Sequence, residues 1–133
     1  MFNCHDTVKL PDTDAAGILF FGNYIKLAHI IYEDFMETIG FSLKFIIDEA
    51  DYLILIAHTD ADYKKSLRLG DGYDLSVQVE KIGNCSFTLK YCFTDLNDDA
   101  VAEMQTVHVV VDKTSQRPSP LPKKLIEQLK KYQ

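Results

Sequence analysis

Apolar residues recur at intervals of three and four between Asn23 and Gly40, which is the spacing of one face of an α-helix. The positions that form this stripe are Leu27, Ala28, Ile31, Phe35, Met36 and Ile39. Charged residues occupy the intervening positions, so the pattern predicts a long amphipathic helix with one buried face. Asn23 is a candidate N-cap, and Gly40 is a natural helix terminator. Residues 42–50 predict a second, shorter helix.

The period of the pattern changes to that of β-strands from Leu53 onward. Apolar and polar residues often alternate, and β-branched and aromatic types are frequent, in residues 53–66, 73–82, 86–95 and 101–112. Turn-forming residues separate these segments at Gly70-Asp71-Gly72, Gly83-Asn84 and Asn97-Asp98-Asp99. A further strand at residues 2–10, ahead of Pro11, brings the predicted strands to five.

The order of these elements predicts the fold class. One strand precedes the long helix and four consecutive strands follow it, which favours an antiparallel sheet wrapped around one central helix. Pro118, Pro120 and Pro122 end the last strand, and the apolar spacing beyond them predicts a short C-terminal helix. We therefore expect an α+β fold, with residues 1–133 forming a single domain.

The composition narrows the classes of partner. The chain has 14 Lys and Arg against 20 Asp and Glu, for a formal net charge of -6, which argues against nucleic acid or an anionic membrane surface as the main partner. The most apolar region, residues 17–32, contains Asn23, Lys26 and His29 and is not expected to span a membrane. The chain's three cysteines form no CxxC motif and follow no secretory leader, which predicts free thiols and a cytoplasmic location.

Two aspartates, Asp12 and Asp14, stand directly before the predicted helix, in the segment LPDTDAAGILFFGNY at residues 10–24. Free N–H groups and the helix dipole favour negative charge at such a position. Spacing alone permits three interpretations: one aspartate caps the turn while the other is solvated, the pair binds a metal, or a carboxylate is held there for chemistry. The metal site is the least supported, because no histidine or carboxylate recurs at ligand spacing.

A longer motif includes these aspartates and reads DTDAAGI at residues 12–18 and FFGNY at residues 20–24. It resembles the signature of the hotdog-fold acyl-CoA thioesterases of the 4-hydroxybenzoyl-CoA thioesterase type. Leu69-Gly70-Asp71 is similar to the family's turn before its long central strands, and Leu121-Pro122-Lys123 is similar to its closing segment. Within the family, a further set of residues resembles the 1,4-dihydroxy-2-naphthoyl-CoA hydrolases of quinone biosynthesis. That set is His29, Tyr32, Glu33, His58 and Asp62.

The resemblance implies that the protein hydrolyses an acyl-CoA thioester. It assigns the catalytic carboxylate to Asp14, acting as nucleophile or as general base, and the donor that polarises the thioester carbonyl to the backbone N–H of Phe21. Because a CoA thiolate is a good leaving group, one carboxylate and one donor suffice, and no metal or redox cofactor is expected.

Four more residues are expected to shape the substrate site: Gly17, Asn23, Tyr24 and His58. Three of them also have a structural interpretation. Asn23 is a candidate helix cap, and Tyr24 is a candidate core residue. His58 shares a strand face with two aspartates, so a structural pairing with one of them is an equal alternative.

One departure from the family concerns the CoA phosphates. In the bacterial 4-hydroxybenzoyl-CoA enzyme, consecutive basic residues contact the CoA phosphates. The equivalent positions of this chain hold Gly83-Asn84-Cys85, none of which is basic. We therefore expect phosphate contacts from other basic residues, with Lys64, Lys65 and Arg68 as the first candidates and Lys81 and Lys90 as further ones. The departure also makes 4-hydroxybenzoyl-CoA a less suitable substrate than 1,4-dihydroxy-2-naphthoyl-CoA.

The expected partners are an acyl-CoA substrate and further copies of the chain. A single copy would leave an edge and a face of its sheet open, which favours a homodimer or homotetramer with the thioester held between subunits. The favoured substrate is an aromatic acyl-CoA. The alternatives are a hydrolase of short- and medium-chain acyl-CoA and a protein that binds acyl-CoA without turnover. A hotdog dehydratase is disfavoured because its His and acid pair has no counterpart here.

Overall fold

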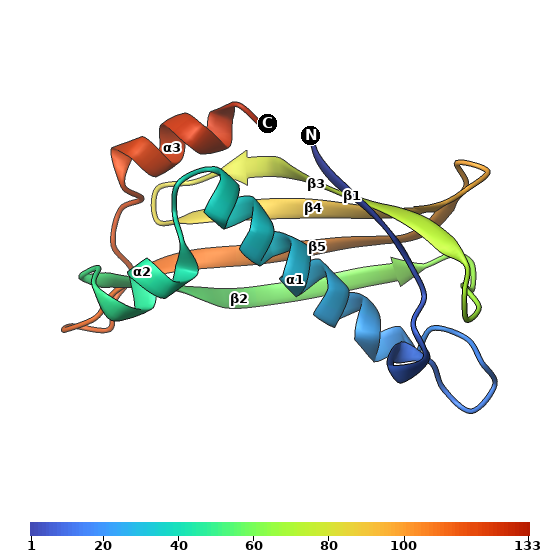
Figure 1. Cartoon of the computed structure of the whole chain (residues 1–133). Helices are drawn as coiled ribbons and strands as arrows, with labels where there is room; N and C mark the ends of the chain where they lie inside the picture. Colours follow the sequence, from blue (N-terminus) through green and yellow to red (C-terminus); the bar gives the residue numbers. More distant parts are fainter.

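Five strands form one antiparallel sheet in this protein, whose structure is a computed structural model describing residues 1–133. The strands are β1 (Phe2–Thr7), β2 (Tyr52–Tyr63), β3 (Gly72–Ile82), β4 (Ser86–Asp95) and β5 (Ala100–Asp112). Their order across the sheet is β1-β3-β4-β5-β2, which places β1 and β2 at the two edges (Figure 1). The predicted α+β class and the five-stranded antiparallel sheet are thus confirmed.

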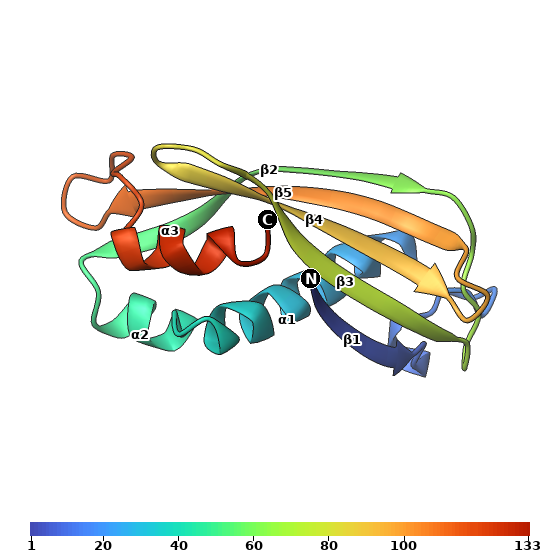
Figure 2. The ribbon, with the colours of Figure 1, turned by 90° about the horizontal axis from the view of Figure 1, so that it is seen from above.

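The α-helices all lie on one face of the sheet, here called the inner face, and the outer face carries none (Figure 2). They are α1 (Phe21–Thr38), α2 (Leu43–Asp48) and α3 (Lys123–Lys130). The 18 residues of α1 make it the longest of them, and it runs obliquely along the inner face. None of these helices combines the length and the apolar character needed to cross a membrane.

Alternation along the strands decides which side chains enter the core. In β4, every second residue is buried and its neighbours are only partly covered, as the pleat of a strand requires. The buried apolar members are Phe87, Leu89, Tyr91 and Phe93, and Asp95 is the buried polar one. β3 contributes Leu75, Val77 and Val79 in the same way. These side chains form one core with the buried face of α1, which consists of Tyr24, Ala28, Ile31, Tyr32, Phe35 and Met36.

The start of α1 differs from the prediction. The helix begins at Phe21 with Phe20 as its N-cap, and no side chain caps it. Asn23 is therefore inside the first turn, and the prediction that it caps the helix is wrong. Its side-chain amide donates instead to the backbone carbonyl of Asp12, with an Nδ2–O distance of 2.8 Å. This contact ties the first turn of α1 to the preceding loop.

Two strand ends also differ from the prediction. The first strand ends at Thr7 rather than residue 10, because Pro11 sits in a 3-10 turn over Leu10–Asp12 and has no N–H for a sheet ladder. The second strand ends at Tyr63 rather than residue 66. The next two N–H groups, of Lys64 and Lys65, both donate to the carbonyl of Val101, at 2.9 and 3.2 Å, so the chain leaves the regular ladder there.

The edge strand β2 carries an irregularity that decides which way its side chains face. It pairs only with β5, and the register shifts between Ile56 and His58. Ile56 lies opposite the buried His108, whereas His58 lies opposite Val107, which faces outward. His58 is therefore on the outer face of the sheet. The other edge of β2 is unpaired.

The turn between β4 and β5 is held by Asp95, a buried carboxylate at the end of β4. One carboxylate oxygen accepts the N–H groups of Asn97 and Asp99, at 2.9 and 3.0 Å, and the other accepts Nζ of Lys65 at 2.5 Å. The Lys65 ammonium and these backbone donors hold the pKa of Asp95 below its usual value. Lys65 thereby ties the chain beyond β2 to the β4–β5 turn.

The lowered pKa of Asp95 predicts a pH dependence of stability. A carboxyl with a lowered folded pKa stabilises the fold above its unfolded pKa of about 4 and loses that contribution as the pH falls through the folded value. We expect the Tm of the wild-type protein to fall as the pH drops from about 5 to about 3. The Asp95→Asn variant should be less stable than wild type at neutral pH and lose less on acidification.

Thermal melts of both proteins across this pH range measure the effect. The matched control is Asp98→Asn, in the same turn, because the Asp98 carboxylate accepts no hydrogen bond from the chain and asparagine tolerates its positive φ of 67°. Parallel Tm curves for wild type and Asp95→Asn would contradict the assignment.

Candidate functional site

A cavity of about 400 Å³ opens where α1 begins. Three segments line it: the loop before α1, the first turn of α1, and the chain that leaves β2. Its lining residues are Asp14, Ile18, Leu19, Phe20, Phe21, Tyr24, Tyr63, Lys64, Lys65 and Ser66. The structure thus brings Asp14 and Phe21, the two residues assigned to catalysis by family resemblance, to the same cavity.

The carboxylate of Asp14 is oriented by its own loop. Its Oδ1 accepts the backbone N–H groups of Ala16 and Ile18, at 2.8 and 3.3 Å, while Oδ2 accepts no hydrogen bond from the chain. The backbone N–H of Gly17 donates to the Asp14 carbonyl at 3.0 Å, and Gly17 has a φ of +75°, a conformation that favours glycine. One carboxylate oxygen is therefore fixed and the other is free for chemistry.

Backbone hydrogen bonds fasten this loop to the segment after β2. Leu19 donates to the carbonyl of Leu67 at 2.8 Å, and Leu69 donates to the carbonyl of Gly17 at 2.9 Å. The segment that carries Asp14 therefore lies beside residues 64–69, although about fifty positions separate them in the sequence.

The amino end of α1 has free backbone donors where Phe21 lines the cavity. The backbone N–H groups of Phe21 and Gly22 donate no hydrogen bond within the chain, as expected for the first turn of a helix. A Cβ at Gly22 would come within 2.9 Å of the Phe20 ring, so glycine lets that ring fold over the first turn. The unpaired N–H groups and the helix dipole together make this end a favourable place for a negatively charged oxygen.

Asp12 has a different role from Asp14. Its carboxylate forms an ion pair with Lys26 of α1, and its backbone carbonyl accepts the N–H of Phe20 at 3.0 Å as well as the Asn23 side chain. It does not line the cavity. Asp12 therefore holds the loop against the first turn of α1, and only Asp14 presents a carboxylate to the cavity.

The four residues expected to shape the substrate site occupy different places. Tyr24 is in the cavity wall, and burial, followed by the neighbouring Tyr63, raises its pKa. Gly17 and Asn23 do not line the cavity. Gly17 holds the loop through its backbone hydrogen bonds, and Asn23 holds the first helical turn through its bond to Asp12. His58 is outside the cavity, on the outer face, where its Nε2 lies 3.0 Å from Oδ2 of Asp60. In a single subunit His58 therefore pairs with Asp60 and does not line the cavity that Asp14 lines.

The three basic residues proposed for the CoA phosphates are not equally available. Lys65 is held by Asp95, and its Nζ also lies 3.4 Å from Asp99. Lys64 lines the cavity and has a single long ion pair, with 3.8 Å between its Nζ and Glu103. Arg68 forms no ion pair and joins the Asp14 loop through a β-bridge to Ile18. Of the three, Arg68 and Lys64 are therefore less engaged by carboxylates of the chain than Lys65 and are more available to bind an anion.

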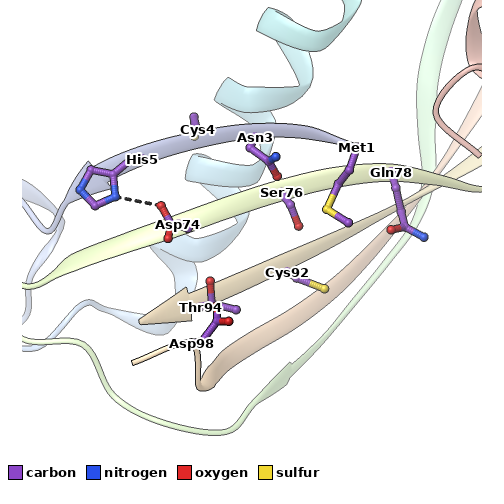
Figure 3. A pocket seen from close by; sticks show the side chains of 10 residues that line it. All are labelled: Met1, Asn3, Cys4, His5, Asp74, Ser76, Gln78, Cys92, Thr94 and Asp98. Carbon is purple, nitrogen blue, oxygen red and sulfur yellow. Dashed lines mark hydrogen bonds and ion pairs between the residues drawn. The ribbon is translucent and has the colours of Figure 1, made fainter. Parts of the chain in front are cut away.

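A larger cavity, of about 680 Å³, lies on the outer face over β1, β3 and β4 (Figure 3). Its polar lining includes His5, whose Nδ1 lies 2.9 Å from Oδ1 of Asp74. No helix begins at this cavity, so it has no helix dipole directed at it as the α1 cavity has. No group of three or more His, Cys, Asp or Glu side chains is arranged to hold a metal ion.

His108, which the sequence analysis did not single out, is a buried histidine of the core. Its ring stacks between Tyr32 and Phe87, with centroid distances of 4.3 and 4.9 Å, and its Nε2 lies 2.7 Å from the Thr106 hydroxyl. Burial lowers the pKa of His108 to about 3, so the ring is neutral at physiological pH. Tyr32, one of the residues of the family resemblance, is buried in this stack and serves packing.

Tyr63 is a cavity residue that the sequence analysis did not identify as part of the site. Its position at the end of β2, directly before Lys64-Lys65, was visible as the last aromatic of a strand pattern. What the sequence does not reveal is that its hydroxyl donates to the Phe21 carbonyl, with an O–O distance of 3.1 Å. The end of β2 is thus joined to the start of α1 through a side chain.

Comparison with known proteins gives consistent results. The 1,4-dihydroxy-2-naphthoyl-CoA hydrolase of Nostoc punctiforme is 30% identical over 128 residues, covering 96% of this chain and 86% of the relative. Slr0204, a 1,4-dihydroxy-2-naphthoyl-CoA thioesterase from Synechocystis, superposes with a TM-score of 0.90 at 24% identity, covering 96% of this chain and 94% of that one.

A Staphylococcus aureus protein, SAV2348, solved in complex with CoA, superposes with a TM-score of 0.91 at 18% identity, covering 98% of this chain and 82% of that one. At these identities the two structures establish the fold. The family model of the thioesterase-like superfamily matches residues 8–129, nearly the whole chain. The chain therefore belongs to the thioesterase-like superfamily.

Proposed function

We propose that this protein is a thioester hydrolase that cleaves an aromatic acyl-CoA, with 1,4-dihydroxy-2-naphthoyl-CoA as the first substrate to test. The observation that carries the proposal is that Asp14, with a free carboxylate oxygen, and Phe21, with an unpaired backbone N–H, line the same cavity. Superfamily membership and the activity for which the relative from Nostoc punctiforme is named support the same reaction.

The wall of the cavity supports an aromatic acyl group. The rings of Phe21, Tyr24 and Tyr63 lie close together there, with 5.2 Å between the centroids of Tyr24 and Tyr63 and 6.2 Å between those of Phe21 and Tyr63. Aromatic rings favour offset and edge-to-face contacts with one another. A hydroxylated aromatic acyl group therefore suits this wall better than a flexible alkyl chain.

The reaction begins with the thioester carbonyl oxygen at the amino end of α1. The N–H of Phe21 donates to this oxygen, and the donation strengthens as the oxygen gains negative charge in the tetrahedral intermediate. A preorganised donor of this kind contributes about 3 kcal/mol to the lowering of the barrier. Because the N–H is already unpaired, no internal hydrogen bond has to break when the substrate binds.

The free oxygen of Asp14 then has two routes. As a nucleophile it attacks the carbonyl carbon, the CoA thiolate leaves, and water hydrolyses the resulting mixed anhydride to the free acid. As a general base it takes a proton from a water molecule, whose oxygen adds to the carbonyl carbon before the thiolate departs and is protonated. Both routes use the same carboxylate, and every reacting group other than water and substrate comes from the chain.

We also propose that two copies pair through β2, in a hotdog arrangement with α1 as the central helix of each copy. Support comes from the unpaired edge of β2, where Leu55 and Ile56 are about half exposed, at 50% and 43%. Such an edge favours pairing with another strand, and a two-fold axis pairs it with itself. The free cysteines accord with a cytoplasmic location.

The catalytic assignment predicts a strong asymmetry between the two aspartates. Asp14→Asn keeps an oxygen that accepts the N–H groups of Ala16 and Ile18, so the loop and the substrate KM should be retained. Turnover should fall about 10²- to 10⁴-fold, the range for loss of acid-base chemistry. Asp12→Asn weakens the ion pair with Lys26, so it should lower stability by about 1 kcal/mol or less and leave kcat within a few-fold.

Thiol-release kinetics and thermal melts on the two variants check this asymmetry, with a panel of aromatic and alkyl acyl-CoA substrates. Full activity in Asp14→Asn would rule out the mechanism. A preference for alkyl chains would keep the mechanism and replace the aromatic substrate with the broad-specificity alternative. Saturable acyl-CoA binding without thiol release by the wild type would favour an acyl-CoA-binding protein.

The availability of the basic residues predicts which of them binds the CoA phosphates. Arg68→Met and Lys64→Met should each raise KM about five- to tenfold with little change in kcat, because contacts remote from the reacting bond are shared by ground and transition states. Lys65→Met should mainly lower the Tm, because it removes the ion pair between Lys65 and Asp95. An unchanged KM in both the Arg68 and Lys64 variants would place the phosphates elsewhere.

The open edge of β2 predicts at least a dimer in solution at micromolar concentration. Light scattering measures the mass directly. A charged residue at the centre of the edge, as in Ile56→Lys, should shift the population toward the monomer, because edge lysines oppose strand pairing. A monomeric mass for the wild-type protein would overturn this part of the proposal.

A further inference from the structure

The hydroxyl of Tyr63 connects the end of the edge strand β2 to the first peptide of α1. It donates to the carbonyl oxygen of Phe21 across 3.1 Å, and the two residues are separated by 42 positions in the sequence. The ring of Tyr63 packs edge-on against Phe21 and Tyr24. This side chain therefore holds the cavity wall and the start of the helix in one arrangement.

The first turn of α1 lacks a side-chain cap, although the Phe20 N–H ties it to the preceding loop by donating to the Asp12 carbonyl at 3.0 Å. Helix ends fray, and a side-chain N-cap usually limits the fraying, but Phe20 at the N-cap position has no group that can accept a backbone N–H. The N–H groups of Phe21 and Gly22 are unpaired. Three further hydrogen bonds restrain this turn: the Asn23 N–H donates to the Phe20 carbonyl at 2.9 Å, the Asn23 side-chain amide donates to the Asp12 carbonyl, and the Tyr63 hydroxyl donates to the Phe21 carbonyl.

The geometry of the peptide unit transmits the restraint to the donors. The carbonyl of Phe21 and the N–H of Gly22 belong to one planar trans peptide, in which the two bonds point in opposite directions. A donor that fixes the direction of the carbonyl therefore fixes the N–H on its other side. The plane is joined through one Cα to the preceding peptide, which carries the Phe21 N–H.

We propose that Tyr63 is a positioning residue for thioester hydrolysis: its hydroxyl, by holding the Phe21 carbonyl, keeps the N–H groups at the start of α1 aimed at the carbonyl oxygen of the substrate. The proposal rests on the function proposed above and adds a residue to it. Tyr63 acts through the backbone of Phe21 and Gly22, and its effect belongs to the step in which negative charge develops on the substrate oxygen.

The test compares Tyr63→Phe with the wild-type enzyme. The variant keeps the ring that packs on Phe21 and Tyr24 and loses only the hydroxyl. The kcat should fall about three- to tenfold, the effect of one hydrogen bond between neutral groups, with KM unchanged. The matched control is Tyr52→Phe at the other end of β2, whose hydroxyl forms no hydrogen bond; it should leave both constants unchanged.

A second measurement reads the donors directly. A non-hydrolysable analogue in which a CH₂ group separates the acyl carbonyl from sulfur retains the carbonyl oxygen, and its C=O stretching frequency falls when donors polarise it. In Tyr63→Phe this frequency should lie closer to its value in water than it does in the wild-type complex.

The outcomes separate this proposal from the function on which it rests. An active wild-type enzyme with unchanged kcat and unchanged carbonyl frequency in Tyr63→Phe would overturn the positioning role alone. A raised KM with unchanged kcat would also overturn it and indicate direct contact between the hydroxyl and the substrate. A wild-type protein inactive on every acyl-CoA tested would overturn the proposed function and this inference with it.

Discussion

The burial of one face of α1 against the inner face of the sheet is the constraint on which the rest of the structure depends. Phe35 and Met36 are completely buried, and Ala28 and Ile31 nearly so. Each large apolar side chain buried in this way contributes about 1.5–3 kcal/mol, so the helix can neither slide nor rotate without losing several such contributions. The position of its amino end is therefore fixed by contacts made along its whole length.

A fixed amino end turns an ordinary helix terminus into a site. Unpaired N–H groups occur at the start of every helix, and most of them face water. Here the Asp14 loop and the segment after β2 close around them, because backbone bonds from Leu19 and Leu69 fasten one to the other. The carboxylate of Asp14 thus stands beside donors that favour negative charge. The proposed chemistry therefore depends on bringing an ordinary carboxylate and ordinary backbone N–H groups to the same cavity.

Much of this arrangement could be predicted from the sequence because it rests on local periodicity. The stripe from Leu27 to Ile39 identified α1, and the alternation in β3 and β4 identified the sheet. The predicted start of α1 was wrong because it rested on the local capping preference of Asn23. In the folded chain the Asn23 side-chain amide donates instead to the backbone carbonyl of Asp12. This tertiary contact, rather than the N-cap propensity of Asn23, determined the position of Asn23 in α1.

The rest of the site depended on features without a sequence signal. A single register shift after Ile56 places His58 on the outer face, and the pattern of apolar and polar residues in β2 does not predict this shift. Lys64, Lys65 and Arg68 look alike in the sequence, yet only Lys65 meets the buried Asp95, some thirty positions away. In the sequence, Tyr63 is an ordinary aromatic residue of a strand, and only the fold shows that its hydroxyl donates to the Phe21 carbonyl. Each case requires the pairing of distant segments.

The most direct measurement of the central claim is a crystal structure with a non-hydrolysable ketone analogue of an aromatic acyl-CoA. The keto oxygen should lie about 3 Å from the backbone nitrogen of Phe21, with the free oxygen of Asp14 facing the carbonyl carbon or a water molecule beside it. An analogue whose carbonyl group binds in the outer-face cavity near His5 and Asp74, or lies away from both Phe21 and Asp14, would contradict the claim that the amino end of α1 is the catalytic centre.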